Sequence, residues 1–283
     1  MANWHIPKGL RTVDIEGYPL AYSDQGRGAP VVLVHGSLND CRSWSAQVEA
    51  LSPSHRVLSL SLRHYYPEPW DGVGGDFSLQ RHAADVAAFI RALGLSGAHL
   101  VGHSRGGSVA YMVARDAPEL AGSLTLAEPR GLEDLLAPED VAGDGSRSNA
   151  GIFEALHADL LKGDKARAVE AFVDAFNGPG SWQALTKLQR TILLDNINTA
   201  VDSGELPGMR CEDIAGFGFP ILLIRGEKSL SRYALGLEAM RRCNSSIAPV
   251  VVIPNAPHGM HRANPAAFNA AVLAFLASVG RTR

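Results

Sequence analysis

Short runs of apolar residues, with almost no alternation of polar and apolar side chains, recur along the chain from residue 31 onwards. A β-strand that is covered on both faces has this pattern, because neither of its faces meets water. The runs are VVLVHG, RVLSLSL, AHLVGHS, SLTLAE, PILLIRG and PVVVIPNAPH. Helical patterns separate most of them, as between residues 78 and 95, where apolar residues recur at i, i+3, i+4 and i+7. This alternation predicts an α/β fold with a mostly parallel sheet and helices on its faces.

Two segments depart from that rhythm. Residues 11–26, RTVDIEGYPLAYSDQG, alternate in polarity on both sides of Gly17, which predicts an antiparallel hairpin at one edge of the sheet. Residues 129–216 have no strand pattern and contain helical stretches such as KARAVEAFVDAFN. We therefore predict a core made of residues 1–128 and 217–283, with residues 129–216 inserted as a helical cap at the carboxyl ends of the strands, where such sheets bind ligands.

Charge and cysteine content exclude several classes of protein. A net charge of −3 provides no basic field for nucleic acid or for a membrane surface, and no apolar stretch reaches the ~18–20 residues that a membrane-spanning helix needs. The first residues have no secretory-signal pattern. The cysteines, Cys41, Cys211 and Cys243, are odd in number and far apart, which predicts no disulfide framework and a reducing cytoplasm. We expect neither a metal nor another cofactor, and a homodimer remains one option.

The sequence GHSRG at residues 102–106 is a G-x-S-x-G motif between a predicted strand and a predicted helix. A sharp strand-to-helix turn crowds the backbone, so that small residues are needed on both sides of an exposed serine. The turn also directs the first amides of the following helix at the reaction centre. The alternative is a glycine-rich turn with an incidental serine. The flanking strand and helix favour Ser104 as a nucleophile.

At this point the sequence resembles the α/β-hydrolase family, over about residues 12–279. The matching pieces are VVLVHGSLNDCRSW, HLVGHSRGGS, the helical insertion and IPNAPHGMHRANP. The resemblance implies an eight-stranded sheet and a Ser–acid–His triad in that chain order. It favours His258 as the base over His261, which we interpret as structural or pocket-lining. It also implies an oxyanion hole made by the backbone amides of Ser37 and Arg105.

The acid of the triad does not stand where the family usually has it. In the loop after PILLIRG the family's Asp position is occupied by Ser229, and the nearest acid, Glu227, lies two residues early. Glu128 ends the strand SLTLAE, and haloalkane dehalogenases and zearalenone-type lactone hydrolases are similar in placing their acid there. We therefore predict Glu128 as the acid, with Glu227 as the alternative and a solvated glutamate as the simpler interpretation of Glu128.

The predicted substrate is a small molecule, apolar or aromatic, with an ester or lactone bond. Where the family often has D-x-x-G-x-G, this chain has an aromatic run, and aromatic residues also occur in the cap, although either group can serve only for packing. The candidate pocket residues are Leu38, Tyr65, Tyr66, Trp70, His103, Phe153, Phe176 and Trp182, and Phe172 is a further aromatic residue of the cap. Hydrolysis of a C–C bond in a diketone and a ligand-binding receptor on the same scaffold are the alternatives. Dehalogenase and epoxide hydrolase are disfavoured, because their relatives use Asp where this chain has Ser104.

Overall fold

In the computed structural model, residues 4–95, 97–136, 149–200 and 208–279 are described. They form an eight-stranded sheet in the order β1-β2-β4-β3-β5-β6-β7-β8. Only the pairs β1–β2 and β2–β4 are antiparallel, and the remaining pairs are parallel. The strands are β1 (Arg11–Ile15), β2 (Tyr18–Gln25), β3 (Pro30–Val34), β4 (Arg56–Leu60), β5 (Ala98–His103), β6 (Ala121–Ala127), β7 (Ile221–Gly226) and β8 (Val251–Ile253). The predicted mostly parallel eight-stranded sheet is confirmed.

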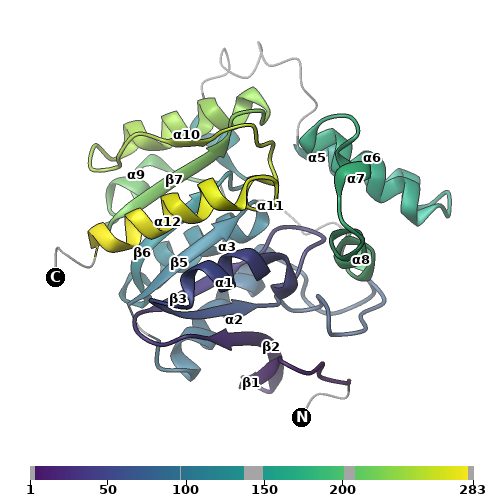
Figure 1. Cartoon of the computed structure of the whole chain (residues 1–283), viewed down its shortest axis with the longest axis horizontal. Coiled ribbons are helices and arrows are strands. Elements are labelled where there is room, and N and C mark those ends of the chain that lie inside the picture. Colours follow the sequence, from purple (N-terminus) through teal and green to yellow (C-terminus); the bar gives the residue numbers. More distant parts are fainter. Residues whose placement is uncertain (1–3, 96, 137–148, 201–207, 280–283) are drawn as a thin grey trace.

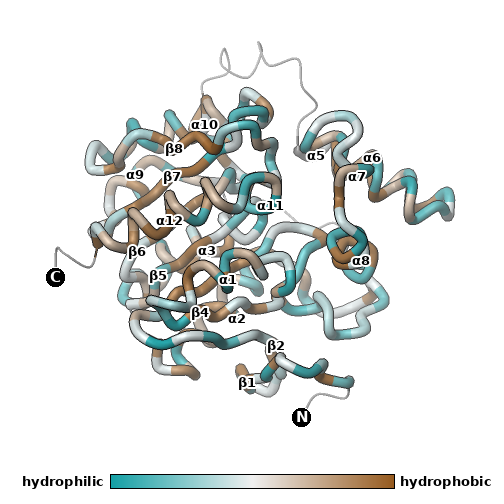
Figure 2. The backbone as a smooth tube through the Cα atoms, viewed as in Figure 1, coloured by the Kyte–Doolittle hydropathy of each residue, from teal (hydrophilic) through white to brown (hydrophobic). Residues whose placement is uncertain are grey.

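The central strands are those that the continuous apolar runs predict. Every residue of β5 and β6 is buried, and in Figure 2 brown, hydrophobic segments recur along the strands of the sheet. The β1–β2 hairpin turns at Glu16 and Gly17, both with positive φ, which is the conformation that glycine adopts without strain. The predicted edge hairpin is therefore present, and it pairs with β4 rather than standing alone.

Helices cover both faces of the sheet. On one face, α1 (Ser45–Leu51) and α12 (Pro265–Val279) bury their apolar side chains against β3 and β7, and they lie in front of the strands in Figure 1. On the other face, α2 (Leu79–Ala92), α3 (Arg105–Asp116) and α10 (Ser231–Cys243) share a larger apolar cluster with the sheet. The short elements in this core are η1 (Cys41–Trp44), η2 (Pro118–Leu120) and α11 (Met260–Ala263).

A separate group of helices packs beside the core and lies at the right of Figure 1. We call it the cap, and it consists of α5 (Asn149–Leu160), α6 (Lys165–Asn177), α7 (Ser181–Ala184), α8 (Lys187–Asp195) and η4 (Ile197–Thr199). Its apolar side chains form a cluster of their own, which Leu38 of the core joins. Arg42 ties the cap to the core, because it bonds both Asp40, at 2.7 Å, and Asp195 of α8, at 2.8 Å.

The two ends of the predicted 129–216 insertion pack differently from its middle. Leu132 in η3 (Leu132–Leu135), Met209, and Ile214 in α9 (Cys211–Ala215) all belong to the apolar cluster of the core. The described helices that pack as a separate group are those between residues 149 and 200. A helical pattern in the sequence therefore does not separate an insertion from helices that line the core.

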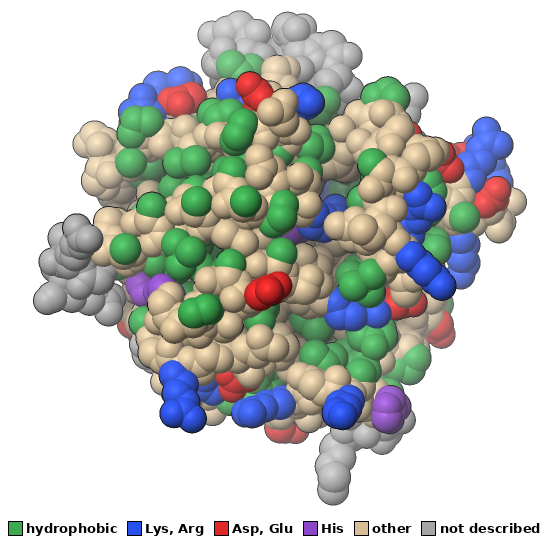
Figure 3. Space-filling model, in the orientation of Figure 1, with side chains coloured by type: hydrophobic (Ala, Val, Ile, Leu, Met, Phe, Trp, Pro, Cys, Tyr) green, Lys and Arg blue, Asp and Glu red, His purple; other side chains and the backbone are tan. Residues whose placement is uncertain are grey.

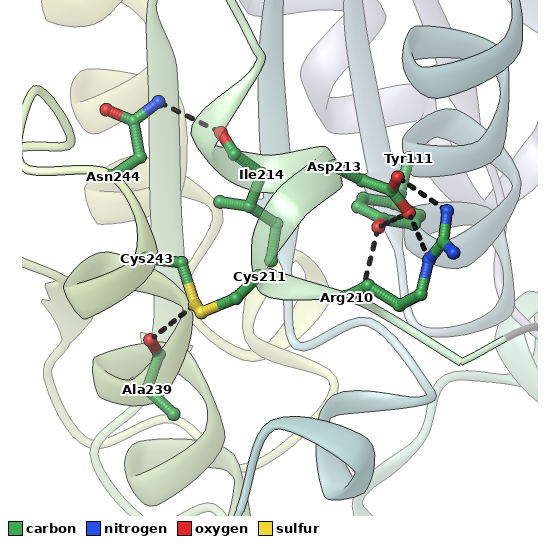
Figure 4. The surroundings of a disulfide bond; sticks show 8 residues. All are labelled: Tyr111, Arg210, Cys211, Asp213, Ile214, Ala239, Cys243 and Asn244. Atoms are coloured by element: carbon green, nitrogen blue, oxygen red, sulfur yellow. Dashed lines mark hydrogen bonds and ion pairs between the residues drawn. A yellow bond between two sulfur atoms is a disulfide. The ribbon is translucent and has the colours of Figure 1, made fainter.

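One prediction is wrong: Cys211 and Cys243 form a disulfide bond, with their Cα atoms 5.0 Å apart (Figure 4). Cys211 begins α9 and Cys243 ends α10, and the two helices lie against each other. Asn244 holds the same junction by donating a hydrogen bond from Nδ2 to the Ile214 carbonyl oxygen, at 3.0 Å. The distance between the two cysteines along the sequence therefore did not show that they lie close together in the fold. Only Cys41 is a free thiol. The prediction of a reducing compartment assumed that the cysteines are unpaired, so it is no longer supported.

The face of the molecule drawn in Figure 3 carries side chains of both charges. On the face drawn in Figure 3, acidic side chains lie among basic ones, and single apolar side chains are scattered between them. None of the helices within the described ranges is both long enough and apolar enough to cross a membrane.

Candidate active site

Ser104 stands on a sharp turn between β5 and α3. Its φ of 52° and ψ of −120° are conformations that a residue with a side chain adopts only under strain. The flanking glycines permit the turn: a Cβ on Gly102 would overlap the Gly106 carbonyl oxygen, and a Cβ on Gly106 would overlap that of Val34. The sheet fixes the turn through a 2.9 Å hydrogen bond from the Ser104 amide to the Ala127 carbonyl oxygen. The motif therefore has the geometry of a nucleophile elbow.

Glu128 and His258 meet behind this turn. Glu128 follows β6, is fully buried and has a φ of 45°. Its Oε2 lies 2.6 Å from His258 Nδ1, and its Oε1 accepts a 2.8 Å hydrogen bond from the Gly226 amide. Glu227, the alternative acid, is exposed and instead accepts a 2.7 Å hydrogen bond from the Asn255 amide. The structure thus brings Glu128, and not Glu227, to the histidine.

Burial controls the ionisation of this pair. It raises the pKa of Glu128 to about 8, against the opposing effects of the Ser229 hydroxyl, the Gly226 amide and two nearby arginines. The Ser229 hydroxyl is near enough to affect the pKa of Glu128, but its Oγ forms no hydrogen bond of normal geometry with a described residue. Burial also lowers the pKa of His258 to about 3, and the charges of Arg232 and Arg262 add to the effect. Both shifts disfavour an isolated charge, so that the two groups titrate as one unit.

Aromatic side chains fix the imidazole of His258. Tyr233 of α10 stacks on one side, with ring centroids 4.8 Å apart and an interplanar angle of 11°. Phe176 of the cap also stacks on the ring, at 5.2 Å and 27°. His103 donates from Nε2 to the His258 carbonyl oxygen at 2.9 Å. His261 is buried between Trp44 and His103 and does not line the cavity described below.

One cavity joins the candidate nucleophile, the histidine and the cap. Its core side consists of Gly36, Ser37, Asn39, His103, Ser104, His258 and Arg262. Its cap side consists of Phe153, Phe172, Val173, Phe176, Asn177 and Leu193. One side of the cavity is therefore polar and the other is largely apolar.

The backbone amides of Ser37 and Arg105 are the groups that the sequence predicts for the oxyanion hole. Ser37 lines it, and Arg105 is the first residue of α3, directly after Ser104. Within the described residues neither amide donates to another protein group, which leaves both available for an oxyanion. The Arg105 side chain points elsewhere: its Nη2 lies 3.0 Å from His82 Nδ1 and 3.2 Å from the Phe77 carbonyl oxygen.

Several of the predicted pocket residues do not line the cavity. Leu38 is fully buried between core and cap, and Tyr65 is buried in the core, 4.6 Å from the ring of His35. Trp70 stacks on His64, and Trp182 lies beneath the Arg190 guanidinium. The Tyr66 ring carries the guanidinium of Arg42 at 3.5 Å. The aromatic run after β4 therefore packs the core and its junction with the cap. Of the predicted set, the cavity contains His103, Phe153 and Phe176, and Phe172 of the cap also lines it.

Sequence reasoning missed three polar residues of the cavity: Asn39, Asn177 and Arg262. Asn39 donates a 2.8 Å hydrogen bond to the Ser37 carbonyl oxygen, and Asn177 Oδ1 accepts one of 2.7 Å from the Gly259 amide. The signal for two of them was their position. Asn39 is two residues beyond Ser37, and Arg262 is four residues beyond His258. Among the described residues, no three His, Cys, Asp or Glu side chains are grouped so that they could hold a metal ion.

Comparison with known proteins agrees with this fold. Residues 31–271 match the profile described as "Alpha/beta hydrolase family". The chain is 31% identical to a dihydrolipoyllysine-residue acetyltransferase component of an acetoin cleaving system from Cupriavidus necator, over 75% of this chain and 55% of the relative. This chain therefore spans about half of that relative's length. It is 28% identical to a putative 2-succinyl-6-hydroxy-2,4-cyclohexadiene-1-carboxylate synthase from Bacillus subtilis, over 95% of this chain and all of the relative.

Solved structures share the fold. A carboxylesterase from Bacillus subtilis superposes with a TM-score of 0.76 at 18% identity, covering 96% of this chain and 93% of the other. A thermophilic esterase from Thermogutta terrifontis superposes with a TM-score of 0.73 at 23% identity, covering 95% and 97%. At these identities the likeness concerns the arrangement of strands and helices, and it leaves the reacting bond undefined.

Proposed function

Because this chain belongs to the α/β hydrolase family, we propose that it is a serine hydrolase that cleaves a carboxylic ester or a lactone through an acyl-enzyme intermediate. Family membership supports hydrolysis, and the choice of bond is the proposal. The observation that carries it is the contact between Glu128 Oε2 and His258 Nδ1, 2.6 Å long, at the cavity that Ser104 also lines.

The proposed reaction gives a role to Ser104, His258, Glu128 and the backbone amides of Ser37 and Arg105. Ser104 Oγ attacks the carbonyl carbon while His258 Nε2 takes its proton, and the Glu128 carboxylate holds the ring through Nδ1–H. The negative charge on the carbonyl oxygen is accepted by the amides of Ser37 and Arg105. His258 then returns the proton to the leaving alcohol. A water, activated by the same histidine, releases the acid and restores Ser104.

Active-site labelling tests the nucleophile directly. A fluorophosphonate probe should modify the peptide that contains Ser104, and the Ser104→Ala variant should remain unlabelled while keeping the wild-type melting temperature. Labelling of a different serine in the wild-type protein would contradict the assignment. Loss of this nucleophile should lower kcat on the order of 10⁶-fold.

A substrate panel tests the bond. We expect p-nitrophenyl esters or lactones to be turned over, with the Ser104→Ala variant as the control for background hydrolysis. Turnover of diketones alone would move the function to C–C bond hydrolysis. Saturable binding without turnover of any of the three classes would instead support a receptor.

A further inference from the structure

Arg262 places a positive charge in the cavity without a negative partner. It is the one arginine or lysine among the lining residues, in α11 just after His258. Its Nη1 donates a 3.0 Å hydrogen bond to Asn39 Oδ1, and its buried Nε has no hydrogen-bond partner. No Asp or Glu oxygen of the described residues lies within 4.0 Å of its guanidinium nitrogens.

Two other partly buried arginines of this chain are paired with acids, whereas the buried Arg105 bonds His82 and the Phe77 carbonyl oxygen instead. Arg63 donates from Nε and Nη2 to both oxygens of Asp85, at 2.7 and 2.8 Å. Arg42 bonds Asp40 and Asp195. A buried cation costs several kcal/mol of desolvation unless a counter-charge or hydrogen bonds offset it. Desolvation correspondingly lowers the pKa of Arg262 to about 10, which still leaves it charged at neutral pH.

The surroundings hold this guanidinium in place. A Cβ on Gly259 would lie 3.2 Å from Arg262 Nη2 and 3.1 Å from Asn177 Oδ1, so that the glycine leaves room for both groups. Asn177 is itself fixed, because its Oδ1 accepts from the Gly259 amide and its Nδ2 donates to the Val173 carbonyl oxygen at 2.9 Å. The arginine is thus held beside two amide side chains and an apolar wall, where water competes little for its free donors.

We propose that Arg262, with Asn39 beside it, binds a carboxylate of the substrate, so that the preferred substrate is an ester or lactone that also bears a free carboxylate group. An arginine presents donors in a planar fork that fits a carboxylate. The bound anion supplies the counter-charge that the described residues do not. This assignment rests on the proposed ester or lactone hydrolysis, since it concerns the substrate of that same cavity.

Matched ester pairs test the assignment. The mono-p-nitrophenyl esters of succinate, glutarate and adipate are compared with those of butanoate, pentanoate and hexanoate, in which a methyl group replaces the carboxylate. For at least one length the acidic ester should have a kcat/KM at least tenfold higher. Arg262→Gln should reduce that preference about 10- to 100-fold, mainly through KM. Arg262→Lys should retain part of it, because the charge remains and the fork is lost.

Two controls separate recognition from structure. Arg241→Gln removes an equal charge from the exposed end of α10, where Arg241 pairs with Glu238, and should leave the preference unchanged. A purely structural role of Arg262, such as holding Asn39, would lower kcat/KM for acidic and neutral esters by the same factor. That result, or equal turnover of each pair by the wild-type enzyme, would overturn the carboxylate site.

A binding measurement distinguishes this proposal from the proposed function. Glutarate should bind to the Ser104→Ala variant in calorimetry, and Ser104→Ala combined with Arg262→Gln should bind it at least tenfold more weakly. If no ester is hydrolysed and Ser104 is not labelled, while glutarate binds through Arg262, ester hydrolysis fails and the carboxylate site stands. If esters are hydrolysed and glutarate does not bind, the function stands and the site is refuted.

Discussion

The two sides of the cavity are built by different means. On the core side, reactive groups follow the ends of sheet strands, and Ser104 and Glu128 both have a positive φ that the neighbouring strands impose. On the cap side, Phe153, Phe172 and Phe176 project from helices that pack mainly on one another. Backbone held by a sheet leaves little freedom to a side chain, whereas a cluster of packed rings can rearrange. We therefore expect the core side to carry out the chemistry and the cap side to select the shape of the substrate.

The strongest test of the core side is the acid. Glu128→Gln removes the negative charge but keeps the side chain's shape, so the imidazolium loses its stabilising partner and Nδ1 its strong acceptor. We expect kcat to fall about 10²- to 10⁴-fold with an unchanged melting temperature. Glu227→Gln is the matched control: it should change kcat only a few-fold, because Glu227 is exposed and bonds the Asn255 amide. The reverse order would move the acid to Glu227.

The second test is the pH dependence of the same pair. The Glu128 carboxyl, whose pKa burial raises to about 8, takes up a proton before His258, whose pKa is lowered to about 3. A protonated Glu128 donates to Nδ1, which leaves the proton of the neutral ring on Nε2, where it cannot accept from Ser104. Activity should therefore be about half of its plateau near pH 8, reach the plateau well above that pH, and fall further as the pH drops.

Rate measurements from pH 5 to pH 10 check this expectation. In Glu128→Gln the remaining titratable group of the pair is the histidine, so the limb of kcat/KM should move to lower pH, although the rate itself is small. A wild-type limb at pH 6.5 or below would show that Glu128 stays ionised in the folded enzyme, and the assignment of the limb to the carboxyl would then be wrong.

The cap side is tested by Phe176, the one cap ring that also touches the histidine. Phe176→Ala removes the ring that stacks on His258 and opens the cavity, so kcat/KM should fall about three- to tenfold and the order of preference among acyl sizes should change. Trp182→Ala provides the control, because Trp182 does not line the cavity and should affect only stability. If both variants lowered kcat/KM by the same factor for every ester, the cap would affect activity only through the stability of the fold.

The sequence predicts the parts that depend on local pattern. The strands followed from continuous apolar runs, and the elbow followed from glycines at fixed distances from Ser104. The location of Glu128 beside His258 was also accessible, because neighbouring parallel strands end at the same edge. Its catalytic role is still a prediction. Orientation was not accessible: Tyr65, Tyr66 and Trp70 are as aromatic as Phe176, and only packing decides that they turn into the core or toward Arg42.

The sequence also did not predict which side chains meet across the fold. The disulfide depends on how α9 folds against α10, and the free charge of Arg262 depends on the absence of an acid nearby among the described residues. Neither can be judged from spacing along the chain, because both are properties of side chains that meet only after the sheet has formed. Patterns in the sequence predict the helices and strands, whereas the contacts between side chains are decided when these helices and strands pack together.

The smallest effect on activity is expected from that disulfide. Cys211 and Cys243 are 32 residues apart in the sequence, and replacing both by Ala removes the cross-link that restricts the unfolded chain between them. The double variant should therefore lose about 2–4 kcal/mol of stability, roughly 5–15 °C in melting temperature. The rate should remain within twofold. Cys243 lies ten residues, about 15 Å, along α10 from Tyr233, the residue that stacks on His258.

The site end of α10 has its own support, which explains why the rate should survive. A Cβ on Gly236 would overlap the Leu132 side chain, so that α10 and η3 pack too closely to slide past each other, and Tyr233 is fully buried. Melting curves and kcat/KM of the double variant, compared with Cys41→Ala as a control that keeps the disulfide, decide the matter. A rate that falls more than tenfold at a temperature where the variant is folded would show that the α9–α10 junction positions the histidine. The rigidity of the core side would then extend beyond the strands to the far end of α10.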